Sequence, residues 1–361
     1  MNQESELIRS WLQLAASRGA SDLHLVPHYK PALRLHGDLI DLDEQPLGES
    51  LLDAGLRQLC GDDKWQQFEQ SHNLDYALRV RTSDQEPDTE QRFRANYFVS
   101  GQSSGACFRV IPSSIPKFEW AGFPYELADR MAHFRNGLVL VTGVTGAGKT
   151  TSLAMIINLL NQEGGYRIIT AEDPIEYVFP RCENSIVTQR EVGQDIQSFA
   201  DGLKYGLRQD PDVILVGEIR DQETAQMALS AAETGHLVFS TLHTRDAKGA
   251  VSRFTDLFRP ATQPEVRAQL AMALRAVVSQ HLLPSAEPGK RQLALEIMIN
   301  NNPIASAIRT GKLESIDTGI VTGRSDGMIS LDESLRRLWK AGAITKDTAE
   351  RFVTDSTILN R

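Results

Sequence analysis

The feature that most constrains this chain is a glycine-rich segment between an apolar run at 138–142 and a helical pattern at 152–160. The segment reads Gly143, Val144, Thr145, Gly146, Ala147, Gly148, Lys149, Thr150 and Thr151. Its glycines allow the backbone to bend so that successive N–H groups point at an anion, and a helix that begins near Gly148 adds its partial positive charge. The order of strand, loop and helix therefore predicts a phosphate loop.

Two side chains at the start of this helix carry the expected chemistry. Lys149 is placed to reach the β and γ phosphates of a nucleotide, and Thr150 to offer its hydroxyl to Mg²⁺. A glycine-rich turn without a ligand is the alternative, but the strand before the segment and the helix after it favour the phosphate loop. The expected ligand is a nucleotide with Mg²⁺.

Composition and charge exclude several classes of partner. The 361 residues are enough for two or three domains, and 24% charged with 41% hydrophobic residues is ordinary for a globular protein. A net charge of −9 gives no long-range attraction to nucleic acid, so none is expected as a partner. The sequence lacks a secretion signal and any apolar stretch near the ~20 residues that span a bilayer, so we expect a cytoplasmic protein.

The three cysteines carry little information. Cys60, Cys107 and Cys182 are widely spaced and odd in number, so neither a disulfide framework nor a zinc site is expected.

The pattern of residues 1–111 predicts a small α+β domain. A helix is expected at about 5–17, and alternating apolar residues predict strands at 22–26, 32–37, 74–80, 93–99 and 106–111. The acidic stretch 82–90 has a proline and no apolar anchor, so it is expected to form an exposed hairpin loop. The proline-punctuated segment 112–124 is expected to be a linker.

Residues 125–361 predict a second domain built on a parallel sheet. Apolar strands alternate with helical or loop segments, at 138–142, 166–170, 213–216 and 237–241. Ligands of such sheets bind beyond the carboxyl ends of the strands. From about 262 onward the chain is expected to be largely helical, with one strand at 292–299.

Two of these strands end in carboxylates. The run 212–217 delivers Glu218 at its tip, where a phosphate loop needs a partner for Mg²⁺ or water. The run 168–171 is followed by two acids, Glu172 and Asp173, one of which could polarise an attacking water. The alternatives are a surface glutamate at the first position and an acidic turn at the second.

Two histidines flank the strand 237–241. Only His243 follows the strand and lies on the expected ligand side, whereas His236 precedes it. His243 could sense the γ-phosphate by donating a hydrogen bond, or it could be an interface histidine satisfied by backbone groups. The residue pattern leaves both hypotheses open.

Four segments in this order, 143–151, 171–179, 212–221 and 231–244, resemble one known family. They are similar to the hexameric secretion-type ATPases, and within them to the type IV pilus retraction ATPases of the PilT/PilU class. The resemblance implies an α/β chain: a PAS-like N-terminal domain and a RecA-like phosphate-loop ATPase domain with a helical C-terminal part. It also implies assembly into a homohexameric ring.

The resemblance implies roles for individual residues. Lys149 and Thr150 would hold the phosphates of ATP and Mg²⁺, Glu218 would be the Walker B acid and Glu172 the general base. Arg94 and Arg109 resemble the N-terminal arginines that close over ATP, a task for which the guanidinium fork is suited. Without the family, both would be interpreted as surface arginines on strands.

The resemblance further implies a motor that retracts the pilus in twitching motility. Its partners would be an inner-membrane platform protein and a paralogous retraction ATPase, which would place it at the inner membrane through the pilus machinery. Export and assembly members commonly carry a tetracysteine zinc insert, which three cysteines cannot form, and this favours retraction.

Other functions stay open at this stage. The family's C-terminal retraction signature is matched only partly by 305–312. An accessory PilU-like ring, or a regulatory ring with little hydrolysis of its own, is therefore the alternative function. A small-molecule phosphate-loop kinase is a third hypothesis, but it gives the N-terminal domain no role.

Overall fold

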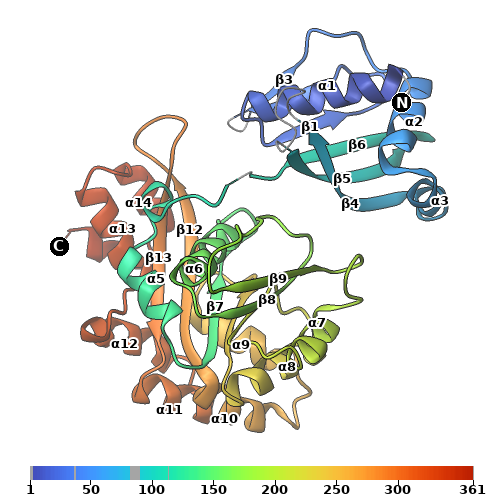
Figure 1. The fold of residues 1–361 in the computed structure, drawn as a ribbon. Coiled ribbons are helices and arrows are strands. Elements are labelled where there is room, and N and C mark those ends of the chain that lie inside the picture. The colour runs from blue at the N-terminus through green and yellow to red at the C-terminus, as the bar shows by residue number, and fades with distance from the viewer. Residues whose placement is uncertain (1–2, 36–37, 82–89, 113, 361) are drawn as a thin grey trace. The chain divides into compact units, whose positions relative to one another are not determined.

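The computed structural model describes residues 3–35, 38–81, 90–112 and 114–360. The chain divides into two compact units, Met1–Ser114 and Ile115–Arg361 (Figure 1). The hairpin loop expected at 82–90 lies outside the described residues except for Glu90. Among the described residues, every helix is too short or too polar to span a bilayer.

The N-terminal unit is a sheet with helices packed on it. Its described residues form six strands in the order β3-β2-β1-β6-β5-β4, and every neighbouring pair is antiparallel. The strands are β1 (Asp22–Leu25), β2 (Ala32–Leu35), β3 (Asp38–Asp41), β4 (Asn73–Arg81), β5 (Glu90–Ser100) and β6 (Ser103–Val110). The helices are α1 (Gln3–Ser17), α2 (Glu49–Cys60) and α3 (Asp62–Ser71).

One face of this sheet carries the core of the unit. Side chains of β5 alternate between buried and partly exposed positions, as expected for a strand with one covered face. The buried set of β5 and β6, including Phe93, Tyr97 and Phe108, packs with Ile8 and Leu12 of α1. The opposite set, which includes Arg94 and Arg109, points away from this core.

The C-terminal unit contains the parallel sheet. In residues 115–360, which the structure describes without a gap, seven strands have the order β13-β12-β7-β11-β10-β8-β9. They are β7 (Gly137–Thr142), β8 (Arg167–Glu172), β9 (Ile186–Glu191), β10 (Val213–Val216), β11 (Leu237–Leu242), β12 (Leu274–Pro284) and β13 (Arg291–Ile299). All neighbours pair in parallel except β12 and β13.

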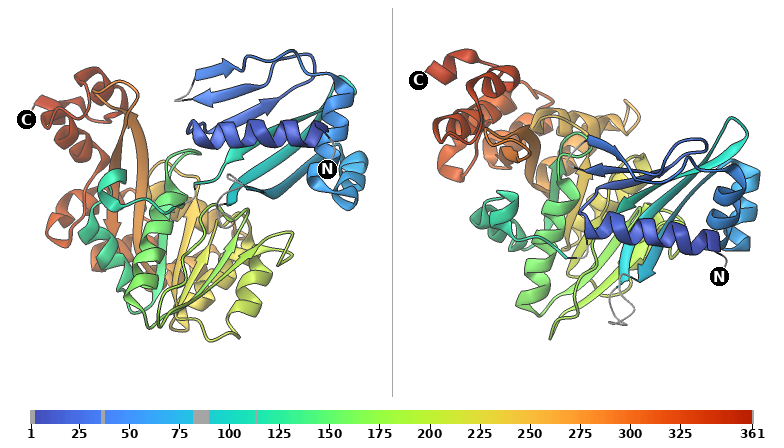
Figure 2. Two further views of the ribbon diagram at one scale, coloured as in Figure 1. Left: turned by 45° about the horizontal axis from the view of Figure 1, so that its top comes forward. Right: turned by 90° about the horizontal axis from the view of Figure 1, so that it is seen from above.

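Helices cover both faces of this sheet (Figure 2). Its principal helices are α5 (Tyr125–Ala132), α6 (Lys149–Glu163), α7 (Phe199–Gly206), α8 (Gln222–Glu233), α9 (Ala247–Asp256) and α10 (Gln263–Ala273). Helices α5 and α6 pack together on one face, and α7 to α10 lie on the other. All residues of β7, β10 and β11 are consequently buried, which explains their continuous apolar sequences.

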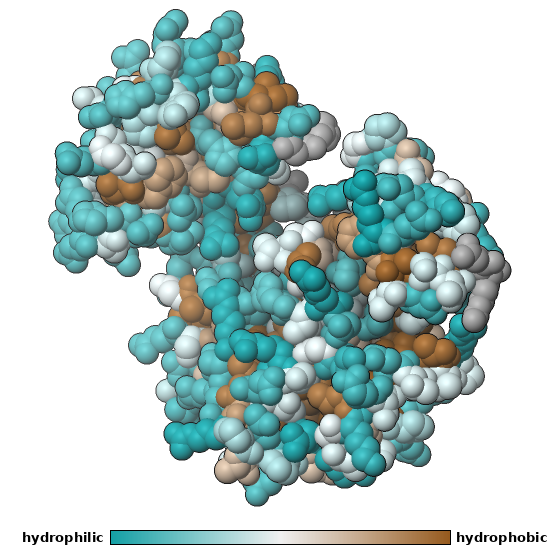
Figure 3. Space-filling model, turned by 180° about the vertical axis from the view of Figure 1, so that it is seen from behind, coloured by the Kyte–Doolittle hydropathy of each residue, from teal (hydrophilic) through white to brown (hydrophobic). Residues whose placement is uncertain are grey.

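The C-terminal part departs from the expected helical segment. It contains two long paired strands, β12 and β13, where only the second was expected. The other helices of the unit are α4 (Phe118–Ala121), α11 (Asn302–Thr310), α12 (Ser315–Thr322), α13 (Leu331–Lys340), α14 (Lys346–Phe352), and the 3₁₀ turns Gly323–Asp326 and Ser356–Asn360. Figure 3 shows that hydrophilic side chains cover most of the face opposite to Figure 1, with hydrophobic residues in separate patches.

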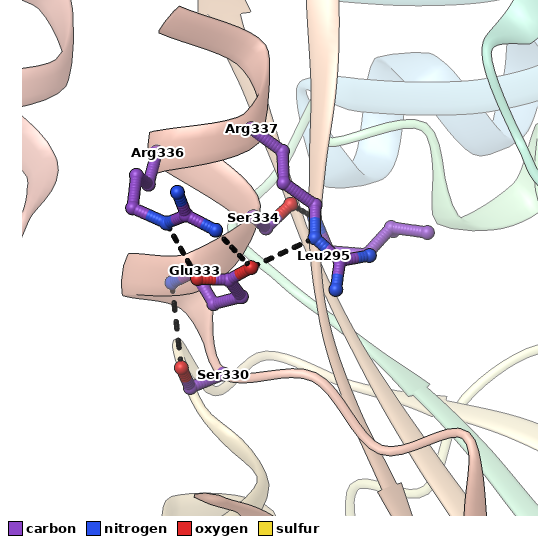
Figure 4. Close-up of polar contacts among 6 residues, drawn as sticks. All are labelled: Leu295, Ser330, Glu333, Ser334, Arg336 and Arg337. Atoms are coloured by element: carbon purple, nitrogen blue, oxygen red, sulfur yellow. Dashed lines mark hydrogen bonds and ion pairs between the residues drawn. The ribbon is translucent and has the colours of Figure 1, made fainter. Parts of the chain in front are cut away.

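A buried carboxylate organises the start of α13 (Figure 4). Glu333 is 7% exposed, and both of its oxygens accept hydrogen bonds from Arg336 at 2.7 Å. Arg337 donates a further bond at 2.9 Å, and the hydroxyl of Ser330 accepts the Glu333 backbone N–H as a helix cap. The bonds from Arg336, and secondarily Arg337, lower the pKa of Glu333 to about 2 against the opposing effect of burial.

Glu333→Gln is expected to lower the stability of the C-terminal unit at pH 7 by about 1.5–3 kcal/mol, because it removes a charged hydrogen-bond acceptor. The folded-state pKa lies below the ordinary value of 4.5, so this stabilisation is complete above pH 4.5 and disappears as the pH falls toward 2. Thermal unfolding at pH 7 and pH 3 tests this. The control is Glu350→Gln, which removes one partner of an exposed ion pair with Lys346. If the Tm difference between wild type and Glu333→Gln is the same at pH 7 and pH 3, the prediction is wrong.

Candidate functional site

The phosphate loop connects the end of β7 to the start of α6. Gly143, Gly146 and Gly148 have φ values of 147°, 81° and 85°, which residues with a Cβ rarely adopt. A Cβ on Gly143 would also lie 2.6 Å from the carbonyl oxygen of Gln280 on β12. The loop therefore needs glycine for its backbone path and, at its first position, for close packing against the neighbouring strand.

The amine of Lys149 lies across this loop. Its Nζ donates hydrogen bonds to the carbonyl oxygens of Gly143 and Val144, at 2.9 and 3.2 Å. Lys149 is only 7% exposed, and burial lowers its pKa while the charges of Glu218 and Glu176 oppose this shift. The loop thus holds a buried amine beside its own backbone, at the start of a helix whose positive end favours an anion.

The adjacent threonines mark the first turn of α6. Thr150 and Thr151 are both partly buried. The hydroxyl of Thr151 lies 3.0 Å from the hydroxyl of Tyr177, which belongs to the segment after β8. This contact joins the first turn of α6 to the segment that follows Glu172.

Glu218 and His243 come together at the ends of neighbouring strands. Glu218 follows β10 and His243 follows β11, and their Oε2 and Nε2 atoms are 3.1 Å apart. The guanidinium of Arg220 pairs with the other oxygen of Glu218. Glu218 is 9% exposed, so the charge of Arg220 and the hydrogen bond with His243 offset the cost of burying its carboxylate. The described hydrogen-bond partner of the His243 side chain is therefore a carboxylate, where one hypothesis expected backbone groups.

Glu172 ends β8 on the same edge of the sheet. β8 and β10 are neighbours in register, and the Gly217 N–H donates to the Ala171 oxygen at 2.8 Å, so Glu172 and Glu218 follow adjacent strands. Glu172 is 5% exposed, and its Oε1 accepts hydrogen bonds from Thr170 at 2.6 Å and Gln189 at 3.0 Å. The C-terminal unit therefore brings the phosphate loop, Glu172, Glu218 and His243 to one edge.

Arg94 and Arg109 belong to the other unit. They lie directly opposite each other on β5 and β6. Each has an acidic partner, Asp75 at 3.3 Å for Arg94 and Asp22 at 2.9 Å for Arg109. The two arginines thus share one register position on this sheet, and each lies beside a carboxylate.

Several residues of the site were not singled out by sequence. Tyr177 and Arg220 lie inside the family-like segments, but their contacts depend on how separate strands meet. Gln189 lies on β9, a strand that the hydrophobic pattern did not indicate. Among the described residues, Asp129 of α5, His133 directly after that helix and Glu163 of α6 also form a cluster able to hold a metal ion, outside the strand-end site.

The Type II/IV secretion system protein family matches residues 109–337, and the chain belongs to this family. Within it, the type IV pilus retraction ATPase PilT of Pseudomonas aeruginosa is 40% identical over 342 residues, or 95% of this chain and 96% of that protein. The type IV pilus ATPase PilU of the same organism is 33% identical over 338 residues, or 94% and 86% of the two chains. A crystal structure of the pilus retraction motor PilT with bound ADP covers 98% of this chain and 99% of its own, with a TM-score of 0.87 and 40% identity.

These similarities confirm the class that the four segments predicted. The chain is PilT-like, with a RecA-like ATPase domain that follows an N-terminal domain built on an antiparallel sheet. It is an ATPase of the secretion ATPase family. Its overall likeness is greater to PilT than to PilU.

Lys149→Ala is expected to lower ATP turnover by about 10²–10³, because Lys149 is predicted to be a preorganised donor to the transferred phosphoryl group. A coupled assay of phosphate release measures this. The matched control is Lys340→Ala, which removes an exposed lysine at the far end of α13 and should leave turnover unchanged. Wild-type turnover in Lys149→Ala would show that the phosphate loop is not part of the catalytic site.

Proposed function

We propose that this protein is a Mg²⁺-dependent ATPase motor that works as a homohexameric ring and drives type IV pilus retraction in twitching motility. The observation that carries the proposal is the gathering of the phosphate loop and two buried carboxylates at one sheet edge, in a chain 40% identical to PilT over nearly its whole length. Its partners are an inner-membrane platform protein and a paralogous retraction ATPase. Its site of action is the cytoplasmic side of the inner membrane.

Mg²⁺ fits the groups that lie beside the phosphate loop. The Thr150 hydroxyl and the Glu218 carboxylate supply oxygen ligands, which this ion prefers. Bound Mg²⁺ neutralises negative charge on the β and γ phosphates. Lys149 holds the same phosphates through its amine, and Glu172 orients the attacking water and accepts its proton. His243 donates to the γ-phosphate from its position beside Glu218.

The proposed ring supplies Arg94 and Arg109 to a nucleotide site. Both side chains retain exposed surface beside their acidic partners, 40% for Arg94 and 63% for Arg109, and a phosphate would contact them there. Ring interfaces of this head-to-tail kind join different surfaces of neighbouring subunits, which allows one subunit to complete the site of another.

A motor also needs a connection from the nucleotide site to its output surface. The segment after His243 is anchored to the C-terminal part: the Ala247 N–H donates to Glu296 of β13 at 2.7 Å. In addition, Lys248 pairs with Glu314 at 3.0 Å and with Asp317 at 2.9 Å, at the start of α12. A displacement of this segment would therefore pull directly on the helices at the C-terminal end.

Arg94→Ala and Arg109→Ala are each expected to leave the ring intact and to slow hydrolysis by about 10³ or more, the effect of removing an arginine that contacts the transferred phosphate. Ring assembly is checked by native mass spectrometry and turnover by phosphate release. Arg57→Ala is the control, since Arg57 is an exposed arginine of the same unit that pairs with Asp62. Constant specific activity after dilution to a proven monomer would contradict a shared site.

The exposed end of α11 tests the motor function separately from hydrolysis. The helix is capped by Asn301 and ends at Gly311, and Ile308 is fully buried, so Ile308 contributes to the core. Arg309 and Lys312 are exposed. We expect the double variant Arg309→Ala, Lys312→Ala to keep normal ATP turnover and to lose twitching motility.

Motility is measured as colony spreading by a strain in which the variant replaces the wild-type copy. The matched control is Arg351→Ala on α14, an exposed arginine that pairs with Asp347. Normal spreading by the double variant at normal protein level would show that α11 has no part in the output surface. An equal loss of ATP turnover would place these residues in the catalytic unit.

A further inference from the structure

A single amide side chain on the edge strand makes three hydrogen bonds around Glu172. Gln189 lies on β9 directly beside Thr170 of β8. Its Nε2 donates to Glu172 Oε1 at 3.0 Å and to the carbonyl oxygen of Tyr177 at 2.7 Å. Its Oε1 accepts the backbone N–H of Phe179 at 3.0 Å. Both the oxygen and the nitrogen of the amide therefore form hydrogen bonds.

These contacts allow only one orientation of the amide. If the oxygen and nitrogen of Gln189 were exchanged, its oxygen would face the oxygens of Glu172 and Tyr177, and its NH₂ group would face the N–H of Phe179. Since Thr170 donates to the same Oε1 at 2.6 Å, two donors from adjacent strands hold one oxygen of Glu172. These donors fix the position of the carboxylate, and a catalytic group must be held in place to act.

The same amide is joined to the phosphate loop. The backbone carbonyl of Tyr177 accepts from Gln189, while the Tyr177 side-chain hydroxyl lies 3.0 Å from the hydroxyl of Thr151 in the first turn of α6. Glu191, two residues after Gln189 on β9, accepts the N–H of Ile175 at 3.0 Å. The segment between Glu172 and Phe179 is therefore fastened to β9 on one side and to the phosphate-loop helix on the other.

We propose that Gln189 is a positioning residue for hydrolysis, which fixes the Glu172 carboxylate relative to the phosphate loop, with Tyr177 as the connection between them. This inference rests on the proposed role of Glu172 as the general base. Gln189 contacts the Glu172 carboxylate and the backbone of Tyr177 and Phe179. Its loss therefore acts on the chemical step rather than on nucleotide affinity.

Gln189→Leu tests this proposal, because leucine has a similar volume and none of the hydrogen bonds. We expect kcat to fall about 10- to 100-fold, the cost of misplacing a catalytic group by about 1 Å, while KM and the affinity for a fluorescent ATP analogue stay within about twofold. Gln189→Glu should lower kcat further, since it places a second carboxylate beside Glu172. Tyr177→Phe should give a smaller loss in the same direction.

Matched controls separate this role from a purely structural one. Gln67→Leu makes the same substitution at an exposed position of α3 and should leave kcat unchanged. Thermal unfolding of each variant shows whether it is folded, and if Gln189→Leu unfolds, Gln189→Glu carries the test. A wild-type kcat in the folded Gln189 variant overturns the proposal, as does a loss that appears in KM alone.

Glu172→Gln distinguishes this proposal from the one on which it depends. If Glu172→Gln loses turnover and Gln189→Leu does not, the positioning role fails and the assignment of the base stands. If Glu172→Gln retains wild-type turnover, the assignment of the base itself is wrong, and with it the role of Gln189.

Discussion

Parallel pairing of four buried strands is the constraint on which the rest of the structure depends. β7 pairs with β11, β11 with β10 and β10 with β8, all in parallel and all without a bulge. Their carboxyl ends therefore meet at one edge, where the phosphate loop, His243, Glu218 and Glu172 each follow a different strand. The site is assembled by the sheet from segments up to about a hundred residues apart in sequence.

Burial and hydrogen bonding then fix the position of each carboxylate. Glu218 and Glu172 are both less than 10% exposed, which would be costly for an isolated charge. Each has a partner from a neighbouring strand or strand end, His243 for Glu218 and Gln189 for Glu172, and Glu172 also accepts a hydrogen bond from Thr170 of its own strand. The protein thereby keeps two acids in fixed positions, and the charge of Glu218 acts on the buried amine of Lys149.

The candidate site could be predicted from the sequence where its residues lie within or directly after a recognisable strand or helix pattern. The phosphate loop and the acids that end strands follow from residue order, since strand, turn and helix are contiguous there. β12 was missed because its first residue, Leu274, follows α10 with no glycine or proline between them. β9 was missed because only one of its six residues is buried, so it lacks a hydrophobic pattern. The position of Gln189 beside Glu172 could not be inferred without that strand.

The contacts of Lys149 have a consequence for the shape of the loop that precedes it. The amine donates hydrogen bonds to the carbonyl oxygens of Gly143 and Val144, so the first residue of α6 is bonded back to the start of the loop. Glycines give the intervening backbone wide conformational freedom, and these two bonds limit it. Lys149 therefore carries a positive charge and also holds together the two ends of the turn in which it lies.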